Sequence, residues 1–141
     1  MGGLLDLFGE AFEEPETYGG NRPSEAYLRR LLAGDTFIAL VAVEGGAVVG
    51  GLAAYELRKF EQERSELYVY DLAVRDTHRR RGIATSLLRT LCAAGRARGA
   101  YVVFVQADRG DEPAIALYTA LGTREEVLHF DIAIGPGDEA A

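Results

Sequence analysis

A basic loop carries the clearest chemical signal in this chain. It has the form R-x-x-G-x-A and stands between a strand-like run that ends at Val74 and a helical pattern that begins at Ile83. A glycine lets the backbone approach a ligand closely, and the amides that follow are the unpaired N–H groups at the positive end of a helix dipole. Such a helix start binds phosphate or pyrophosphate. The predicted cradle comprises Arg79, Arg80, Arg81, Gly82, Ile83, Ala84 and Thr85.

Other common phosphate loops are missing from the sequence. There is no G-x-x-x-x-G-K-[ST], and no G-x-G-x-x-G opens a helix. The alternative for the R-x-x-G-x-A loop is a basic strand-to-helix turn that binds nothing. Its position directly between a strand and an amphipathic helix favours the phosphate site, because such a motif needs that context.

Asp71 is a carboxylate inside the apolar strand pattern of residues 66–74. A buried carboxylate is costly unless it is paired or functional. Strict alternation puts Val69, Asp71 and Ala73 on one face, with Tyr68, Tyr70, Leu72 and Val74 on the other. If Asp71 faces a cleft, it can hold a substrate ammonium and accept its proton. The alternative is a structural Asp that is hydrogen-bonded to backbone at a bulge.

Two further acids, Asp108 and Asp111, follow the next strand pattern. Ligands of α/β sheets bind at the carboxyl ends of strands, so we expect residues 71–84 and 106–111 to surround one cleft. The functional interpretation is an anionic wall for a cationic substrate. The alternative is a solvated loop, with Asp111 as a helix N-cap.

Composition narrows the function classes. The chain has 141 residues, which predicts a single domain over 1–141. The net charge of −7 argues against a general nucleic-acid partner and favours cationic ones. The start lacks the basic region of a signal peptide, and no run is long and apolar enough for a membrane span. Cys92 is the only cysteine and lies on the expected core face of a helix, so we predict a cytoplasmic protein with no disulfide and no metal site.

The periodicities predict an α/β domain with a mixed sheet. A loose helical pattern over 4–12 precedes a loop over 13–23, and Ser24 is a good N-cap for a helix that Gly34 ends. Gly45 and Gly46 separate two apolar runs, as in a β-hairpin. We then expect strands over 66–74, 101–106 and 126–134, and helices over 83–98 and from Asp111 to Gly122. The strands at 66–74 and 101–106 should be parallel, joined by a helical crossover.

The sequence resembles the aminoglycoside 3-N-acetyltransferases of the GNAT superfamily along nearly its whole length. The matching segments include Leu5 to Gly9, Thr36 to Leu40, Phe60 to Gln62, Tyr70 to Val74, Arg79 to Ala84, Val105 to Asp108, Asp111 to Ala114, Ala116 to Tyr118 and His129 to Asp131. The resemblance implies the GNAT fold, a mixed central sheet flanked by helices. The family has an N-terminal strand before its first helix, whereas no strand pattern precedes Leu4, so we expect that edge strand to be missing.

The resemblance also implies an activity and roles for residues. The expected reaction is direct acetyl transfer from acetyl-CoA to the 3-amino group of an aminoglycoside, which confers antibiotic resistance. The strand before the loop is splayed in the family, and its residues Leu72, Ala73 and Val74 would bind the pantetheine. Tyr118 would protonate the leaving thiolate, although a tyrosine on a helix is more often core. A homodimer is expected on the same ground. The alternatives are a GNAT enzyme for another amine, such as a polyamine or lysine, and a CoA-binding module without turnover.

Overall fold

The computed structural model describes residues 2–11 and 23–135. It divides into two compact units, Met1–Gln106 and Ala107–Ala141, and each is described by itself. The single domain over 1–141 stays a prediction. The expected loop over 13–23 lies outside the described residues except at its last position.

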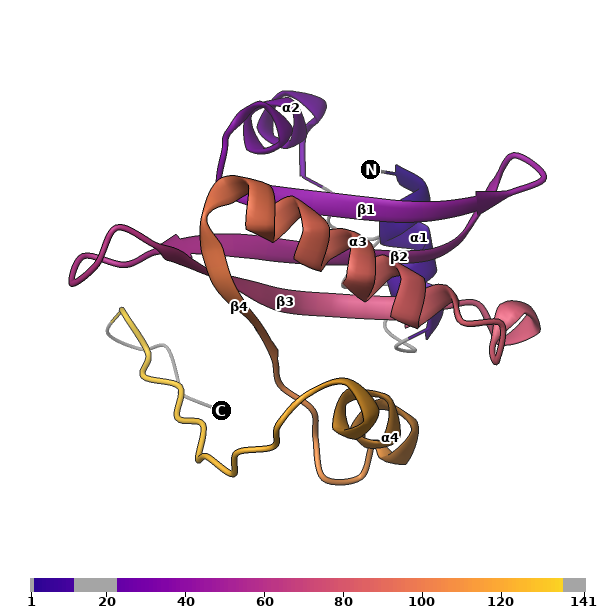
Figure 1. The fold of residues 1–141 in the computed structure, drawn as a ribbon. Coiled ribbons are helices and arrows are strands. Elements are labelled where there is room, and N and C mark those ends of the chain that lie inside the picture. The colour runs from indigo at the N-terminus through magenta and orange to yellow at the C-terminus, as the bar shows by residue number, and fades with distance from the viewer. Residues whose placement is uncertain (1, 12–22, 136–141) are drawn as a thin grey trace. The chain divides into compact units, whose positions relative to one another are not determined.

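The first unit is built on a four-stranded sheet in the order β1-β2-β3-β4 (Figure 1). Its strands are β1 (Phe37–Glu44), β2 (Ala47–Arg58), β3 (Ser65–Val74) and β4 (Ala100–Val105). The pairs β1–β2 and β2–β3 are antiparallel and β3–β4 is parallel, so the predicted mixed sheet is confirmed. Gly45 and Gly46 have φ values of 59° and 80°, as a tight hairpin turn requires, which confirms the hairpin.

Helix α3 (Ile83–Arg98) covers one face of the sheet and has the bounds that the sequence predicted (Figure 1). Its buried residues are Leu87, Leu88, Leu91 and Gly95. Gly95 lies against Leu67 of β3, where an added Cβ would come within 2.8 Å of the leucine side chain. Cys92 is exposed, so its predicted core position is wrong. The buried stripe passes through Leu91 and Gly95, and Cys92 lies to its side.

The opposite face of the sheet packs against α1 (Gly2–Ala11). Leu4, Leu7 and Phe8 of this helix form a buried cluster with residues of all three antiparallel strands: Phe37, Ala53 and Ala73. Helix α2 (Glu25–Ala33) follows, with the Ser24 hydroxyl accepting a hydrogen bond from the Tyr27 amide at 3.1 Å. The predicted N-cap is therefore confirmed.

Strand β2 carries two consecutive glycines where both helices approach it. A Cβ on Gly50 would lie 2.8 Å from Cγ2 of Ile83, the first residue of α3. A Cβ on Gly51 would collide with Leu4 of α1 on the other face. The start of α3, where the basic loop ends, is thus held directly against the sheet backbone.

A buried carboxylate links the far end of α3 to the sheet. Glu56 of β2 is 7% exposed and accepts hydrogen bonds from Arg98 and from the Ser65 hydroxyl, both at 2.7 Å. Arg98 also donates to the backbone carbonyl of Asp35 at 2.7 Å. The carboxylate is thus paired on both oxygens, as a buried charge needs to be.

The second unit contains α4 (Glu112–Leu121), capped by Asp111 and ended at Gly122 as predicted. The strand predicted over 126–134 is wrong, because residues 123–134 have no regular structure. A strand exists through hydrogen bonds to a neighbouring strand, and alternating apolar residues alone do not supply them. The apolar side chains of this stretch, among them Phe130 and Ile132, are 79% and 88% exposed.

Candidate functional site

The loop between β3 and α3 presents a set of unpaired backbone amides. A 3₁₀ turn over Asp76–His78 leads into it, and Gly82 is the N-cap of α3 with φ 75° and ψ 14°. Within the described chain, the amides from Arg80 to Thr85 have no hydrogen-bond acceptor, and the Ser86 amide is the first to bond back, to the Gly82 carbonyl at 2.9 Å. Donors that converge at a helix start bind an anion. The geometry therefore fits the predicted phosphate cradle.

Arg80 contributes its backbone to this cradle in an unusual way. Its φ is 64°, the left-handed region, and no other non-glycine residue of the described chain has a positive φ. Such a conformation is costly for a residue with a Cβ, and it occurs at ligand sites more than elsewhere. The glycine at position 82 indicated that the backbone there can adopt a left-handed conformation, whereas nothing in the sequence indicated the same conformation at Arg80.

The charges of the loop are partly compensated by acids. Arg79 lies 3.0 Å from Asp76, and Arg81 lies 3.3 Å from Glu44 at the end of β1. His78 Nε2 is 3.4 Å from the same Glu44 carboxylate. These pairs are at the surface, where an ion pair contributes only about 0–1 kcal/mol. A polyanion bound at the amides can therefore recruit the guanidinium groups.

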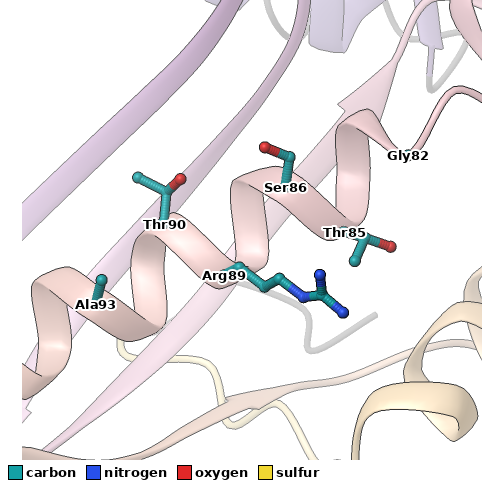
Figure 2. Close-up of a pocket in the computed structure, with 6 residues that line it drawn as sticks. All are labelled: Gly82, Thr85, Ser86, Arg89, Thr90 and Ala93. Carbon is teal, nitrogen blue, oxygen red and sulfur yellow. The ribbon is translucent and has the colours of Figure 1, made fainter.

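An open groove continues from the loop along α3. Figure 2 shows its lining in succession along the helix, from Gly82 through Thr85, Ser86, Arg89 and Thr90 to Ala93. Its volume is about 520 Å³. Thr85 was predicted as part of the cradle, whereas Ser86, Arg89 and Thr90 were missed. Their spacing of three and four residues would have shown that they share the polar face of the helix.

Strand β3 loses its neighbour on the β4 side before it reaches the loop. The β3–β4 pairing runs from Ser65 to Val69, while pairing with β2 continues to Val74. Within the described chain, the edge of β3 beyond Val69 thus has no partner strand, which matches the splay that the resemblance implied. Leu72 and Val74 are half-buried there, and Ala73 is buried against α1.

A β-bulge places Asp71 on the α1 face of the sheet. Asp71 pairs with Ala53, and the next pair along is Val69 with Ala54, so Tyr70 is the extra residue. Val69 is buried with Leu67, which packs against α3. Strict alternation, which grouped Val69 with Asp71, was therefore wrong at this point. The change of face between Val69 and Asp71 is caused by the extra residue of the bulge, which shifts the side chains that follow to the other face of the sheet.

The bulge brings Asp71 to a group of aromatic side chains. Burial is the main cause that raises the pKa of the Tyr55 and Tyr68 phenols, and the negative charge of Asp71 raises both further. The Tyr70 ring contacts both phenols, with centroid distances of 6.1 Å and 5.7 Å. No role was predicted for these tyrosines from the sequence. Their appearance at Tyr68 and Tyr70, two positions apart and next to Asp71, was the available signal.

The second unit carries the remaining predicted residues. The Asp111 side chain accepts from the Ala114 amide at 3.3 Å, so it has the predicted capping role. Asp108 is exposed, and its carbonyl accepts from the Asp111 amide at 3.0 Å. Tyr118 is half-buried, and its pKa is raised mainly by burial and further by Asp111. Whether these residues share a cleft with residues 71–84 stays a prediction.

The described residues offer neither a metal cluster nor a membrane span. Residues 2–11 and 23–135 contain no group of three or more His, Cys, Asp or Glu side chains that could hold a metal ion. None of the helices within these two ranges is long and apolar enough to span a membrane.

Comparison with protein-family models identifies a family for most of the chain. Residues 3–123 match the model of the acetyltransferase (GNAT) family. The curated proteins include a probable N-acetyltransferase family 8 member 5 from Mus musculus, which is 31% identical over 94 residues. That alignment covers 67% of this chain and 41% of the mouse protein, so the chain spans about two fifths of this relative.

Solved structures give more extensive matches. A crystal structure of an aminoglycoside acetyltransferase from an uncultured soil metagenomic sample is 67% identical, with a TM-score of 0.94 over 96% of this chain and 90% of that one. A second aminoglycoside acetyltransferase of similar origin was solved with sisomicin and with trehalose. The sisomicin complex is 31% identical, with a TM-score of 0.86 over 94% of this chain and 87% of that one.

Proposed function

The chain belongs to the acetyltransferase (GNAT) family, and from this premise we propose that it transfers the acetyl group of acetyl-CoA to an amino group of an aminoglycoside. One observation carries the choice of substrate: the 67% identity to an aminoglycoside acetyltransferase over 96% of this chain. The second neighbour, solved with sisomicin, supports the same class. Within that class we propose the 3-amino group as the acceptor, which rests on the family resemblance of the sequence.

The cosubstrate site is proposed at the loop and the splayed strand. The amides from Arg80 to Thr85, which have no acceptor in the described chain, would donate to the pyrophosphate. Arg89 in the groove of α3 would add a charged donor for phosphate oxygens. The edge of β3 beyond Val69 would take the pantetheine, since its backbone has no strand partner there within the described chain.

The proposed chemistry is a direct transfer. Asp71 accepts a proton from the substrate ammonium, and the neutral amine nitrogen attacks the thioester carbonyl. A backbone amide at the open edge of β3 stabilises the tetrahedral oxyanion. The carbon–sulfur bond then breaks, and the Tyr118 phenol donates its proton to the thiolate. The acylated nitrogen loses its remaining extra proton to solvent, which gives the neutral amide, and the Tyr118 phenolate takes up a proton from solvent. The raised pKa of Tyr118 keeps that proton in place throughout the neutral range.

The biological consequence follows from charge. Acetylation converts an ammonium group into a neutral amide and so weakens the hold of the drug on anionic RNA. We therefore propose an antibiotic-resistance enzyme of the cytoplasm that needs no metal. The net charge of −7 argues against a nucleic-acid partner, because nucleic-acid-binding proteins are usually basic. A homodimer is proposed on the resemblance alone, and size-exclusion chromatography with light scattering tests it.

Thiol release from acetyl-CoA tests the proposed function. The purified chain is assayed with sisomicin, with spermidine, with a lysine peptide and without acceptor, and the product is located by mass spectrometry and NMR. We expect turnover with sisomicin and acetylation at the 3-amino group. Preference for spermidine or the peptide would refute the aminoglycoside class, whereas acetyl-CoA binding without turnover on any acceptor would indicate a non-catalytic module.

A further inference from the structure

Five aromatic rings form a continuous row across the sheet on the face opposite α3. We call this the aromatic row: Phe37, Tyr55, Tyr70, Tyr68 and Phe104. Successive ring centroids are 5.3, 6.1, 5.7 and 4.6 Å apart, and Tyr68 and Phe104 are stacked with an interplanar angle of 4°. All four strands of the sheet contribute to the row. Its spacing is that of interacting aromatic pairs.

The rings of the row differ in exposure, and the central one is the most exposed. Phe37 is 7% exposed and belongs to the cluster beneath α1, whereas Tyr70 is 64% exposed. The Tyr70 hydroxyl makes no hydrogen bond to any described residue, while the Tyr68 hydroxyl donates to Gln106 at 2.8 Å. The extra residue of the bulge is thus a tyrosine with a largely exposed side chain, and its hydroxyl has no hydrogen-bond partner among the described residues.

Tyr70, the central and most exposed ring of the row, adjoins the carboxylate of Asp71. Asp71 follows Tyr70 directly, and its charge acts on the phenols of Tyr55 and Tyr68. An aromatic face attracts a cation through its quadrupole, and a carboxylate attracts the same cation directly. The apolar face of an aromatic ring also packs against the C–H groups of a sugar ring. Together these features suit a ring that carries both C–H faces and ammonium groups.

We propose that the aromatic row, through Tyr70, is a platform for an aminosugar ring of the acceptor and selects ring-shaped polyamines over linear ones. This rests on the proposed function and adds a specificity-determining surface to it. Tyr70 holds the ring face, and Asp71 holds an ammonium group of the same sugar. A linear polyamine satisfies the carboxylate but offers no ring to stack, so it gains less from the platform.

The test compares three variants with the wild type. Tyr70→Ala removes the ring, Tyr70→Phe keeps it without the hydroxyl, and Phe60→Ala removes an aromatic ring that is fully exposed in the loop between β2 and β3. Dissociation constants for sisomicin, spermidine and acetyl-CoA are measured by calorimetry on variants shown by circular dichroism to be folded. If Tyr70→Ala does not fold, Tyr70→Leu takes its place, because leucine retains apolar bulk without an aromatic face.

We expect Tyr70→Ala to weaken sisomicin binding about tenfold. This is roughly the effect of losing the contacts of one aromatic ring with an ammonium group and a sugar face. Tyr70→Phe and Phe60→Ala should bind it within about twofold of the wild type, and acetyl-CoA binding should stay unchanged in all variants. Equal losses for sisomicin and spermidine would overturn the ring-face proposal, as would unchanged sisomicin binding by Tyr70→Ala while the wild type acetylates the drug. A wild type that does not acetylate aminoglycosides would instead refute the proposed function, and the platform with it.

Discussion

The two glycines that cap α3 allow the cradle to be tested against a matched control. Gly82 and Gly99 stand at opposite ends of the same helix with nearly equal backbone angles, φ 75° and ψ 14° against φ 84° and ψ 16°. At both positions the space that a Cβ would occupy has no neighbouring atom within 4 Å, so neither substitution causes a clash. A left-handed conformation costs a non-glycine residue about 1–2 kcal/mol. Gly82→Ala and Gly99→Ala should therefore destabilise the fold by similar amounts.

Only the variant at Gly82 should affect cosubstrate binding. In Gly82→Asp, a carboxylate would stand among the amides that we assign to the pyrophosphate. Two unit charges about 4 Å apart repel by about 1 kcal/mol in bulk water and about 4 kcal/mol near a protein surface. Since 1.4 kcal/mol is a factor of about ten, acetyl-CoA affinity should fall by about fivefold to a thousandfold. Gly99→Asp places the same charge at the far end of α3 and should leave affinity unchanged.

Calorimetry with acetyl-CoA and urea unfolding provide the two measurements. The predicted pattern is a similar loss of unfolding free energy in both Ala variants and a loss of affinity in the Gly82 variants alone. A folded Gly82→Asp protein with the dissociation constant of the wild type would show that the amides of the loop do not hold the pyrophosphate. Equal affinity losses at Gly82 and Gly99 would show that helix stability, and not the cradle, controls binding.

Four further outcomes follow from the same reasoning. Tyr118→Phe should lower kcat with little change in KM, because proton donation acts in the transition state. The raised pKa of Tyr118 further predicts that kcat shows no alkaline decline from this phenol below about pH 10. A decline of kcat at lower pH that disappears in Tyr118→Phe would contradict this prediction. Asp71→Asn should lose most of kcat/KM for the aminoglycoside and still bind acetyl-CoA, whereas an unfolded or CoA-deficient variant would mark Asp71 as structural. KM for the aminoglycoside should rise with salt and with Asp108→Asn, since screening acts over about 8 Å at physiological ionic strength; a KM that is insensitive to both would remove Asp108 from the substrate site. Arg98→Met should lower the unfolding free energy by about 3–5 kcal/mol, because it leaves Glu56 buried without its partner, and an unchanged urea midpoint would show that the pair contributes nothing.

The sequence predicted those parts of the fold that local patterns determine. Helix α3 begins at Ile83 and ends before Gly99 as expected, because its apolar periodicity and its capping glycines lie in one continuous segment. The hairpin at Gly45 and the N-cap at Ser24 depend on residue types that few other conformations favour. The parallel pairing of β3 with β4 followed from the helix between them.

Features that depend on register or on distant partners were not accessible in this way. The bulge at Tyr70 inserts one residue into an otherwise regular ladder, and the sequence indicated a bulge near Asp71 only as one of two alternatives. The residues of 126–134 alternate as a strand does, yet strand formation needs a neighbour that the pattern cannot specify. For the candidate site, the loop motif predicted the cradle, which the loop geometry fits, while the aromatic row depends on rings from four strands that only the folded sheet brings together.

The paired glycines of β2 have an evolutionary consequence. Because Gly50 and Gly51 carry no side chain, Ile83 on one face and Leu4 on the other lie directly against the β2 backbone. A larger residue at Gly51 is compatible with this packing only if Leu4 is replaced by a smaller residue, and one at Gly50 would push the first turn of α3, with its unpaired amides, away from the sheet. Divergent relatives should therefore exchange volume between these positions in pairs, so that coupled substitutions across β2 record how the placement of the cradle is inherited.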